Sequence, residues 1–143
     1  PPVNMIYGYA EGIRLVLEEG MEKRYARHKA YGKAVRAALT AYGMKPLAEE
    51  KAAAATLSCI LYPDGIKDSE FRSKLASKGV VVAGALAYLS GKAFRIGHMG
   101  NTTKDMLEEA IKLIGETLID LGHPANIEKA LTLFAEHFST SVR

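Results

Sequence analysis

The chain has 143 residues and a formal net charge of +3, with 48% hydrophobic and 24% charged residues. This length suits one domain with a real core, and the composition is that of an ordinary globular protein. No basic run is interleaved with aromatic residues, which argues against a nucleic-acid partner. No apolar run reaches the ~18 residues of a membrane span and no signal peptide is visible, so we expect a cytoplasmic protein without a membrane partner.

Two helices are predicted first. Asn4 is a plausible N-cap, and Gly20 stands where a left-handed C-cap residue would end the helix. The apolar residues between them have helical spacing: Ile6, Tyr9, Ile13, Val16 and Leu17. A longer helix over 21–42 carries a narrow stripe: Met21, Tyr25, His28, Gly32, Val35, Leu39 and Tyr42. We interpret its basic residues as a solvated face: Lys23, Arg24, Arg27, Lys29, Lys33 and Arg36.

The middle of the chain predicts three strands and a short helix. The segment 56–62 reads as a strand with Leu57, Cys59 and Leu61 on one face, and Cys59 is interpreted as a small core residue. The segment 68–78 is helical, and 80–83 is a second strand. In the third strand, side chains alternate, so Phe94 and Ile96 face the core and Arg95 faces away.

Two helices complete the chain. Thr102 and Asp105 resemble a capping box, and the helix they open ends at Gly122. Its apolar face is expected to hold Met106, Ala110, Leu113 or Ile114, and Thr117 or Leu118. Pro124 is expected to begin the last helix, with this buried face: Ile127, Leu131, Phe134 and Phe138. The predicted fold is α+β, a small, mostly antiparallel sheet of three to four strands with helices packed on one face.

Recognisable catalytic motifs are absent from the sequence. The four histidines are scattered, so no metal site is predicted, and His28 is expected to be a half-buried histidine with an ordinary partner. No phosphate-binding loop, dinucleotide fingerprint or nucleophile elbow occurs. The strongest candidate is Arg95, because a guanidinium on a rigid strand can grip a carboxylate with two parallel hydrogen bonds. The plain alternative is an arginine on a solvated sheet face.

Several short segments, in order, carry a family resemblance. They are Pro1-Pro2-Val3, Leu17-Glu18-Glu19-Gly20 followed by Arg27-His28, Gly79 through Gly84, Ser90 through Gly100, and Asn101-Thr102-Thr103. From 1 to about 121 the chain resembles the C-terminal small domain of class V aminotransferases, which are fold-type I pyridoxal-phosphate enzymes. It looks most like the alanine–glyoxylate and serine–pyruvate group.

The resemblance implies a function and a division of the chain. It implies that Arg95 binds the carboxylate of a small amino acid or 2-keto acid, and that this chain holds no catalytic, cofactor-binding or metal-binding residue. The lysine that binds pyridoxal phosphate would lie upstream, in a large domain that this chain lacks, so we expect the chain alone to be inactive. The whole enzyme would be a homodimer. Within 1–143, a single small domain, we expect an interdomain helix over 1–20 and an α+β body over 21–143.

One departure and two alternatives stay open. The family often has a second glycine after the position of Gly84, followed by Leu-Gly-Pro, whereas this chain has Ala85-Leu86-Ala87-Tyr88, which leaves alanine–glyoxylate specificity open. The extra helix after 120 carries no assigned role. A non-catalytic α+β binding or interaction domain is the main alternative. A related enzyme with desulfurase-like or epimerase-like chemistry is another, although the mid-strand position of Cys59 argues against a desulfurase.

Overall fold

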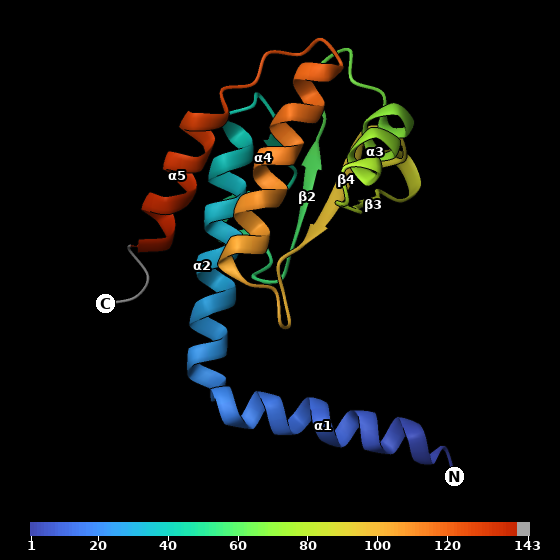
Figure 1. Cartoon of the computed structure of the whole chain (residues 1–143), viewed down its shortest axis with the longest axis vertical. Coiled ribbons are helices and arrows are strands. Elements are labelled where there is room, and N and C mark those ends of the chain that lie inside the picture. The colour runs from blue at the N-terminus through green and yellow to red at the C-terminus, as the bar shows by residue number, and fades with distance from the viewer. Residues whose placement is uncertain (140–143) are drawn as a thin grey trace.

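The structure is a computed structural model that describes residues 1–139, with side chains through 137. Its helices are α1 Val3–Glu19, α2 Met21–Thr40, α3 Asp68–Ser77, α4 Lys104–Asp120 and α5 Ile127–Ser139. Its strands are β1 Lys45–Pro46, β2 Leu57–Leu61, β3 Ala83–Gly84 and β4 Ala93–Gly97. Two short 3₁₀ turns, η1 Glu50–Ala52 and η2 Ala87–Leu89, lie in the connections (Figure 1).

The four strands form one antiparallel sheet in the order β1-β2-β4-β3. The two long strands are central, and their register pairs Ile60 with Phe94 and Cys59 with Arg95. On the other side of β4, Ala83 of β3 is the second partner of Arg95. The predicted α+β class, with a small antiparallel sheet, is confirmed.

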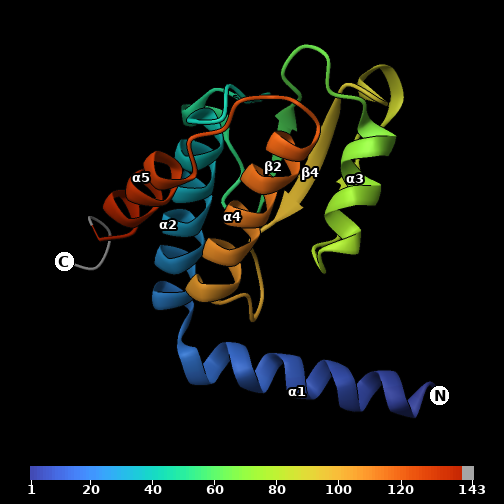
Figure 2. The ribbon, with the colours of Figure 1, turned by 45° about the horizontal axis from the view of Figure 1, so that its top comes forward.

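The core lies between one face of the sheet and the helices. Ile60 and Ile96 face it, and Phe94 stacks against Phe71 of α3 with ring centroids 5.2 Å apart. Helices α2, α4 and α5 supply further fully buried apolar residues: Val35, Leu39, Ile111, Ile114, Leu118, Ala130 and Phe134. Each large apolar side chain buried in this way stabilises the fold by about 1.5–3 kcal/mol. Figures 1 and 2 show the helices on this side of β2 and β4.

Helix α1 stands apart from this body. None of its residues is buried, and Figures 1 and 2 show it projecting sideways from the start of α2. The change of direction falls at Gly20, whose φ of +86° is a conformation that L side chains rarely adopt. Most of the apolar stripe predicted for this helix is therefore exposed to solvent, including Tyr9 and Leu17.

Three predicted helix starts are wrong by one to three residues. Helix α1 begins at Val3, so Asn4 lies inside its first turn and caps nothing. Helix α4 is capped by Thr103, whose hydroxyl accepts a hydrogen bond from Met106 N–H, whereas the Thr102 hydroxyl donates to the Met99 carbonyl. The last helix begins after Asn126, whose side chain accepts from Lys129 N–H, and not at Pro124.

Strand and face assignments also needed correction. The segment 80–83 is mostly outside the sheet, because only Ala83 and Gly84 pair with β4. In β2 the core side holds Ser58 and Ile60, while Leu57, Cys59 and Leu61 are half-buried on the other face, so Cys59 is not a core residue.

The predicted apolar faces of the helices are partly wrong. Met106 is exposed, and its neighbour Leu107 is buried instead. Met21 and Tyr25 at the start of the α2 stripe are exposed too. The side chain of Phe138, predicted to be buried, lies outside the described residues.

Candidate functional site

Arg95 is placed by the alternation of β4. Phe94 and Ile96 are buried on the core side, while Arg95 is half-buried on the opposite face. The prediction of its direction is therefore correct. The strand is central in the sheet and its two flanking core residues are buried, so the Cα of Arg95 is held rigidly.

The Arg95 side chain is oriented by one backbone contact. Its Nε donates to the carbonyl oxygen of Gly84 at 2.9 Å. This bond uses the inner nitrogen of the guanidinium and leaves the two terminal nitrogens for a further partner. A fork of two terminal N–H groups matches the two oxygens of a carboxylate.

The other arginines of the described chain already hold carboxylates. Arg14, Arg24, Arg27, Arg36 and Arg72 each have a carboxylate oxygen at 2.9 Å or less. Within residues 1–139, Arg95 is the one arginine with no carboxylate of the chain in ion-pair range. Its charge is thus held on a rigid strand without internal compensation, as a site for an external anion requires.

A buried polar network fixes the end of β4. Arg36 donates from Nε and Nη2 to both oxygens of Glu50 at 2.9 Å and from Nη1 to Ser58 Oγ at 3.2 Å. Ser58 Oγ in turn lies 3.0 Å from Nε2 of His98, which is fully buried just after β4. A Cβ at Gly32 would lie 2.9 Å from His98 Cε1, so this glycine lets α2 approach the ring.

This network corrects the prediction that Arg36 belongs to a solvated helix face, since its side chain is 7% exposed. Arg27 and Arg24 are also half-buried and paired with Glu19. Burial, and after it the charge of Arg36, lowers the pKa of His98 to about 4, so the ring is neutral at pH 7. The sequence held no signal for this network beyond the small residue at Gly32 on the helix stripe.

The loop after β4 is tied to α2 as well. Nε2 of His28 accepts the Gly100 N–H at 3.1 Å, and Arg27 Nη2 donates to the Gly100 carbonyl at 2.9 Å. His28 is half-buried, and burial is the main reason why its pKa is lowered. The prediction of an ordinary, hydrogen-bonded His28 is confirmed.

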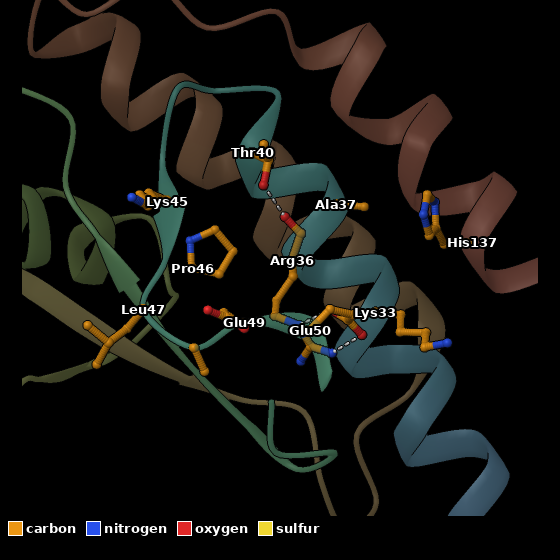
Figure 3. Close-up of a pocket in the computed structure, with 11 residues that line it drawn as sticks. Lys33, Arg36, Ala37, Thr40, Lys45, Pro46, Leu47, Glu49, Glu50 and His137 are labelled. Atoms are coloured by element: carbon orange, nitrogen blue, oxygen red, sulfur yellow. Dashed lines mark hydrogen bonds and ion pairs between the residues drawn. The ribbon is translucent and has the colours of Figure 1, made fainter. Parts of the chain in front are cut away.

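A hollow lies elsewhere on the molecule, between α2, β1 and η1 (Figure 3). It measures about 680 Å³, and its lining includes Lys33, Arg36, Lys45, Glu50 and His137. In Figure 3 the Arg36 guanidinium is turned toward Glu50, so its charge is already compensated. Arg95 does not line this hollow.

The Arg95 face does not by itself fit pyridoxal phosphate. The cofactor needs an amine for the Schiff base and several donors for its phosphate, whereas the neighbouring strand side chains are Leu57, Cys59, Leu61 and Ala83. The N-terminus of α4, a place where a phosphate could bind, is occupied by its own Thr103 cap. The residues described form no group of three or more metal-ligating side chains. Across residues 1–139, no helix is long and apolar enough to cross a membrane.

Comparison with known proteins finds aminotransferases among the relatives of this chain. An uncharacterized aminotransferase of Methanocaldococcus jannaschii is 48% identical over 101 residues, 70% of this chain and 26% of that protein. The (S)-ureidoglycine–glyoxylate transaminase of Bacillus subtilis is 33% identical over 132 residues, 92% of this chain and 32% of that protein. The crystal structure of pyridoxamine–pyruvate aminotransferase from Mesorhizobium loti superposes with a TM-score of 0.92 at 30% identity, over 98% of this chain and 36% of that one. No protein-family profile matches the chain.

These relatives are aminotransferases, and the structural neighbours have the same α+β fold as this chain. Its homologues are aminotransferases of the serine/alanine–glyoxylate type, and its structural neighbours are class V aminotransferases. It spans about a third of the length of the relatives that it matches, which is consistent with a C-terminal fragment. The resemblance predicted from the sequence is confirmed at this level.

Proposed function

We propose that this chain is the C-terminal small domain of a pyridoxal-phosphate-dependent aminotransferase and that Arg95 binds the substrate carboxylate. The observation that carries the proposal is that the Arg95 guanidinium is oriented by the protein but has no carboxylate partner among the described residues. Nε is anchored on the Gly84 carbonyl, and no carboxylate among the described residues occupies the terminal nitrogens. The proposed substrate class, a small amino acid and a 2-keto acid, is supported by the glyoxylate-type homologues.

In this role Arg95 binds and orients without moving a proton. A guanidinium carries donors and no acceptor, so it can fix both oxygens of the α-carboxylate but cannot serve as a base. Two parallel hydrogen bonds fix the carboxylate plane and thereby the direction of the bonds at the substrate Cα. Pyridoxal phosphate, when bound, supplies the electron sink for amino-group transfer, and we propose that its lysine belongs to another part of the longer protein.

The remaining assignments follow from the resemblance alone. Residues 1–20 would be the interdomain helix and 21–143 the body of the small domain. The whole enzyme would be a cytoplasmic homodimer, and the chain by itself would be inactive. The segment Ala85-Leu86-Ala87-Tyr88 would border the substrate, and its departure from the family pattern leaves the choice of amino donor and keto acceptor open.

The test compares Arg95→Ala and Arg95→Lys in the whole enzyme, on an amino acid and on the matching amine that lacks the carboxylate. Truncating one partner of a desolvated charge pair costs about 2–5 kcal/mol, or roughly a 30-fold to several-thousand-fold loss in kcat/KM. Lysine should restore only part of it, since a point charge cannot form the fork. A loss below threefold on the amino acid, or an equal loss on the amine, would remove Arg95 from this role.

A further inference from the structure

Helix α1 packs few apolar side chains against the rest of the chain, so apolar packing does little to fix its direction. No residue of α1 is buried, and the half-buried ones, Leu15, Val16 and Glu19, lie near its C-terminal end. The chain then bends at Gly20, a residue with no side chain to limit rotation. A helix joined in this way needs a specific contact at the bend if it is to keep one orientation.

That contact is a cluster of one carboxylate and two arginines. Oε1 of Glu19 accepts from Arg27 Nε at 2.6 Å, and Oε2 accepts from Arg27 Nη2 at 2.9 Å and from Arg24 Nη1 at 2.7 Å. The three side chains are only 17–25% exposed, so water competes weakly for these bonds. The hydrogen bond from Arg27 is the main cause that lowers the pKa of Glu19 to about 2.

The same guanidinium also holds the loop that follows Arg95. Arg27 Nη2 donates to the Gly100 carbonyl at 2.9 Å, and Nη1 reaches the Thr102 carbonyl at 3.4 Å. On the next residue of α2, His28 accepts the N–H of Gly100. One arginine therefore touches the end of α1 and the segment between β4 and α4.

We propose that Arg27 is a positioning residue that couples the direction of α1 to the loop carrying Gly100 and Thr102, and through it to the end of the strand of Arg95. If α1 rotates about Gly20, Glu19 moves and displaces the Arg27 guanidinium with it. The loop then loses the Arg27 N–H groups that donate to the carbonyls of Gly100 and Thr102. The coupling is a property of this chain and does not depend on the proposed function. Arg14 offers a matched control, because its ion pairs with Glu11 and Glu18 lie wholly within α1.

The experiment measures the direction of α1 and the protection of the Gly100 loop in the 143-residue chain. For the direction of α1, spin labels are placed at Ala10→Cys on α1 and Ala76→Cys on α3, both exposed positions, in a Cys59→Ser background. Labelled chains are diluted into unlabelled ones, so that distances within one chain dominate. For the loop, hydrogen exchange of the Gly100 amide is followed in the same variants without labels.

We expect one narrow distance distribution in the parent and in Arg14→Gln. In Glu19→Gln we expect the distribution to broaden at least twofold and the Gly100 amide to exchange at least threefold faster, although Glu19 does not touch Gly100. Arg27→Gln should increase the width and the exchange rate further. If Arg27→Gln does not fold, the result for Glu19→Gln decides whether the coupling exists. A broad distribution in the parent, an unchanged width in Glu19→Gln, or unchanged Gly100 exchange would each overturn the proposal.

Discussion

Cys59 and Arg95 are cross-strand partners on the face of the sheet turned away from the core. Directly opposed residues have Cβ atoms about 4.5–5.5 Å apart. Burial raises the pKa of the Cys59 thiol, and the charge of Arg95 only partly opposes this. The side chain facing Arg95 is therefore small and neutral at pH 7, and it leaves the guanidinium charge uncompensated.

This pairing predicts that Cys59→Asp blocks the proposed site. A carboxylate at position 59 can reach the Arg95 guanidinium across the strands and occupy its terminal nitrogens. In the whole enzyme, KM for an amino acid should rise about 10- to 100-fold, while turnover of the matching amine stays within a few-fold. Cys59→Asn, of the same shape without the charge, is the control. Equal effects of the two substitutions would mean that position 59 acts through size or packing.

The chain alone is predicted to form no specific covalent adduct with pyridoxal phosphate. The strand side chains around Arg95 include no lysine, and the α4 N-terminus is capped from within. Incubation with the cofactor, reduction with borohydride and mass spectrometry should give only scattered, substoichiometric labelling. One lysine modified to completion at equimolar cofactor would show that the attachment site lies in this chain.

Glu50→Ala is predicted to destabilise the fold by about 1–2 kcal/mol. It leaves the buried Arg36 charge without its carboxylate, and the half-exposed position of Glu50 keeps the cost below the 3–5 kcal/mol of a fully buried pair. The neighbouring Glu49→Ala removes a pair with Lys51 in which both side chains are at least 75% exposed, and it should cost less than about 0.5 kcal/mol. Denaturant unfolding of both variants checks this, and equal losses would contradict it.

The direction of the Arg95 side chain could be predicted from the sequence because the pattern of apolar and charged residues around it is unambiguous. Two large apolar residues flank one charge, so the period of two leaves a single arrangement. Strand β2 has no charged residue among its apolar ones, so its sequence does not show which face is buried. Ser58 is its most polar residue and yet faces the core, because Arg36 and His98 satisfy its hydroxyl there. Hydrophobic alternation cannot foresee a buried hydroxyl whose partners come from two other elements.

The same limit explains the basic residues of α2. Arg36 looks like a surface residue in the sequence, and its partner Glu50 is brought to it by the turn through β1 and η1. Likewise, residues 80–82 form an apolar run typical of a strand, but they find no paired neighbour, and Val81 remains exposed. Pairing is a property of the assembled sheet, which local propensity does not contain.

Mild acid is predicted to destabilise the protein through His98. Its pKa is about 4 in the folded chain and about 6.5 when unfolded, so between these values the unfolded chain binds a proton that the native ring does not. The stabilisation is complete above pH 6.5 and is lost as the pH falls toward 4.

The free energy of unfolding should therefore drop by about 1–2 kcal/mol from pH 7 to 5, a window above the range in which the lowered carboxyl groups titrate. His98→Gln should lower stability at pH 7 and make this slope shallower, leaving the smaller part due to His28. Denaturant melts at several pH values give the slope. An unchanged slope in His98→Gln would assign the acid sensitivity to other groups.

The exposed apolar residues of α1 predict that the 143-residue chain folds but self-associates. Tyr9 and Leu17 are 72% and 70% exposed, on a helix with no buried residue. Contiguous apolar surface of several hundred Å² on a folded chain favours association. Sedimentation should show a mass that rises with concentration. Tyr9→Lys with Leu17→Lys should move that rise to at least tenfold higher concentration, whereas Tyr88→Lys, at a residue 80% exposed on η2, should not. A strictly monomeric parent at high concentration, or an equal effect of Tyr88→Lys, would show that α1 is not the associating surface.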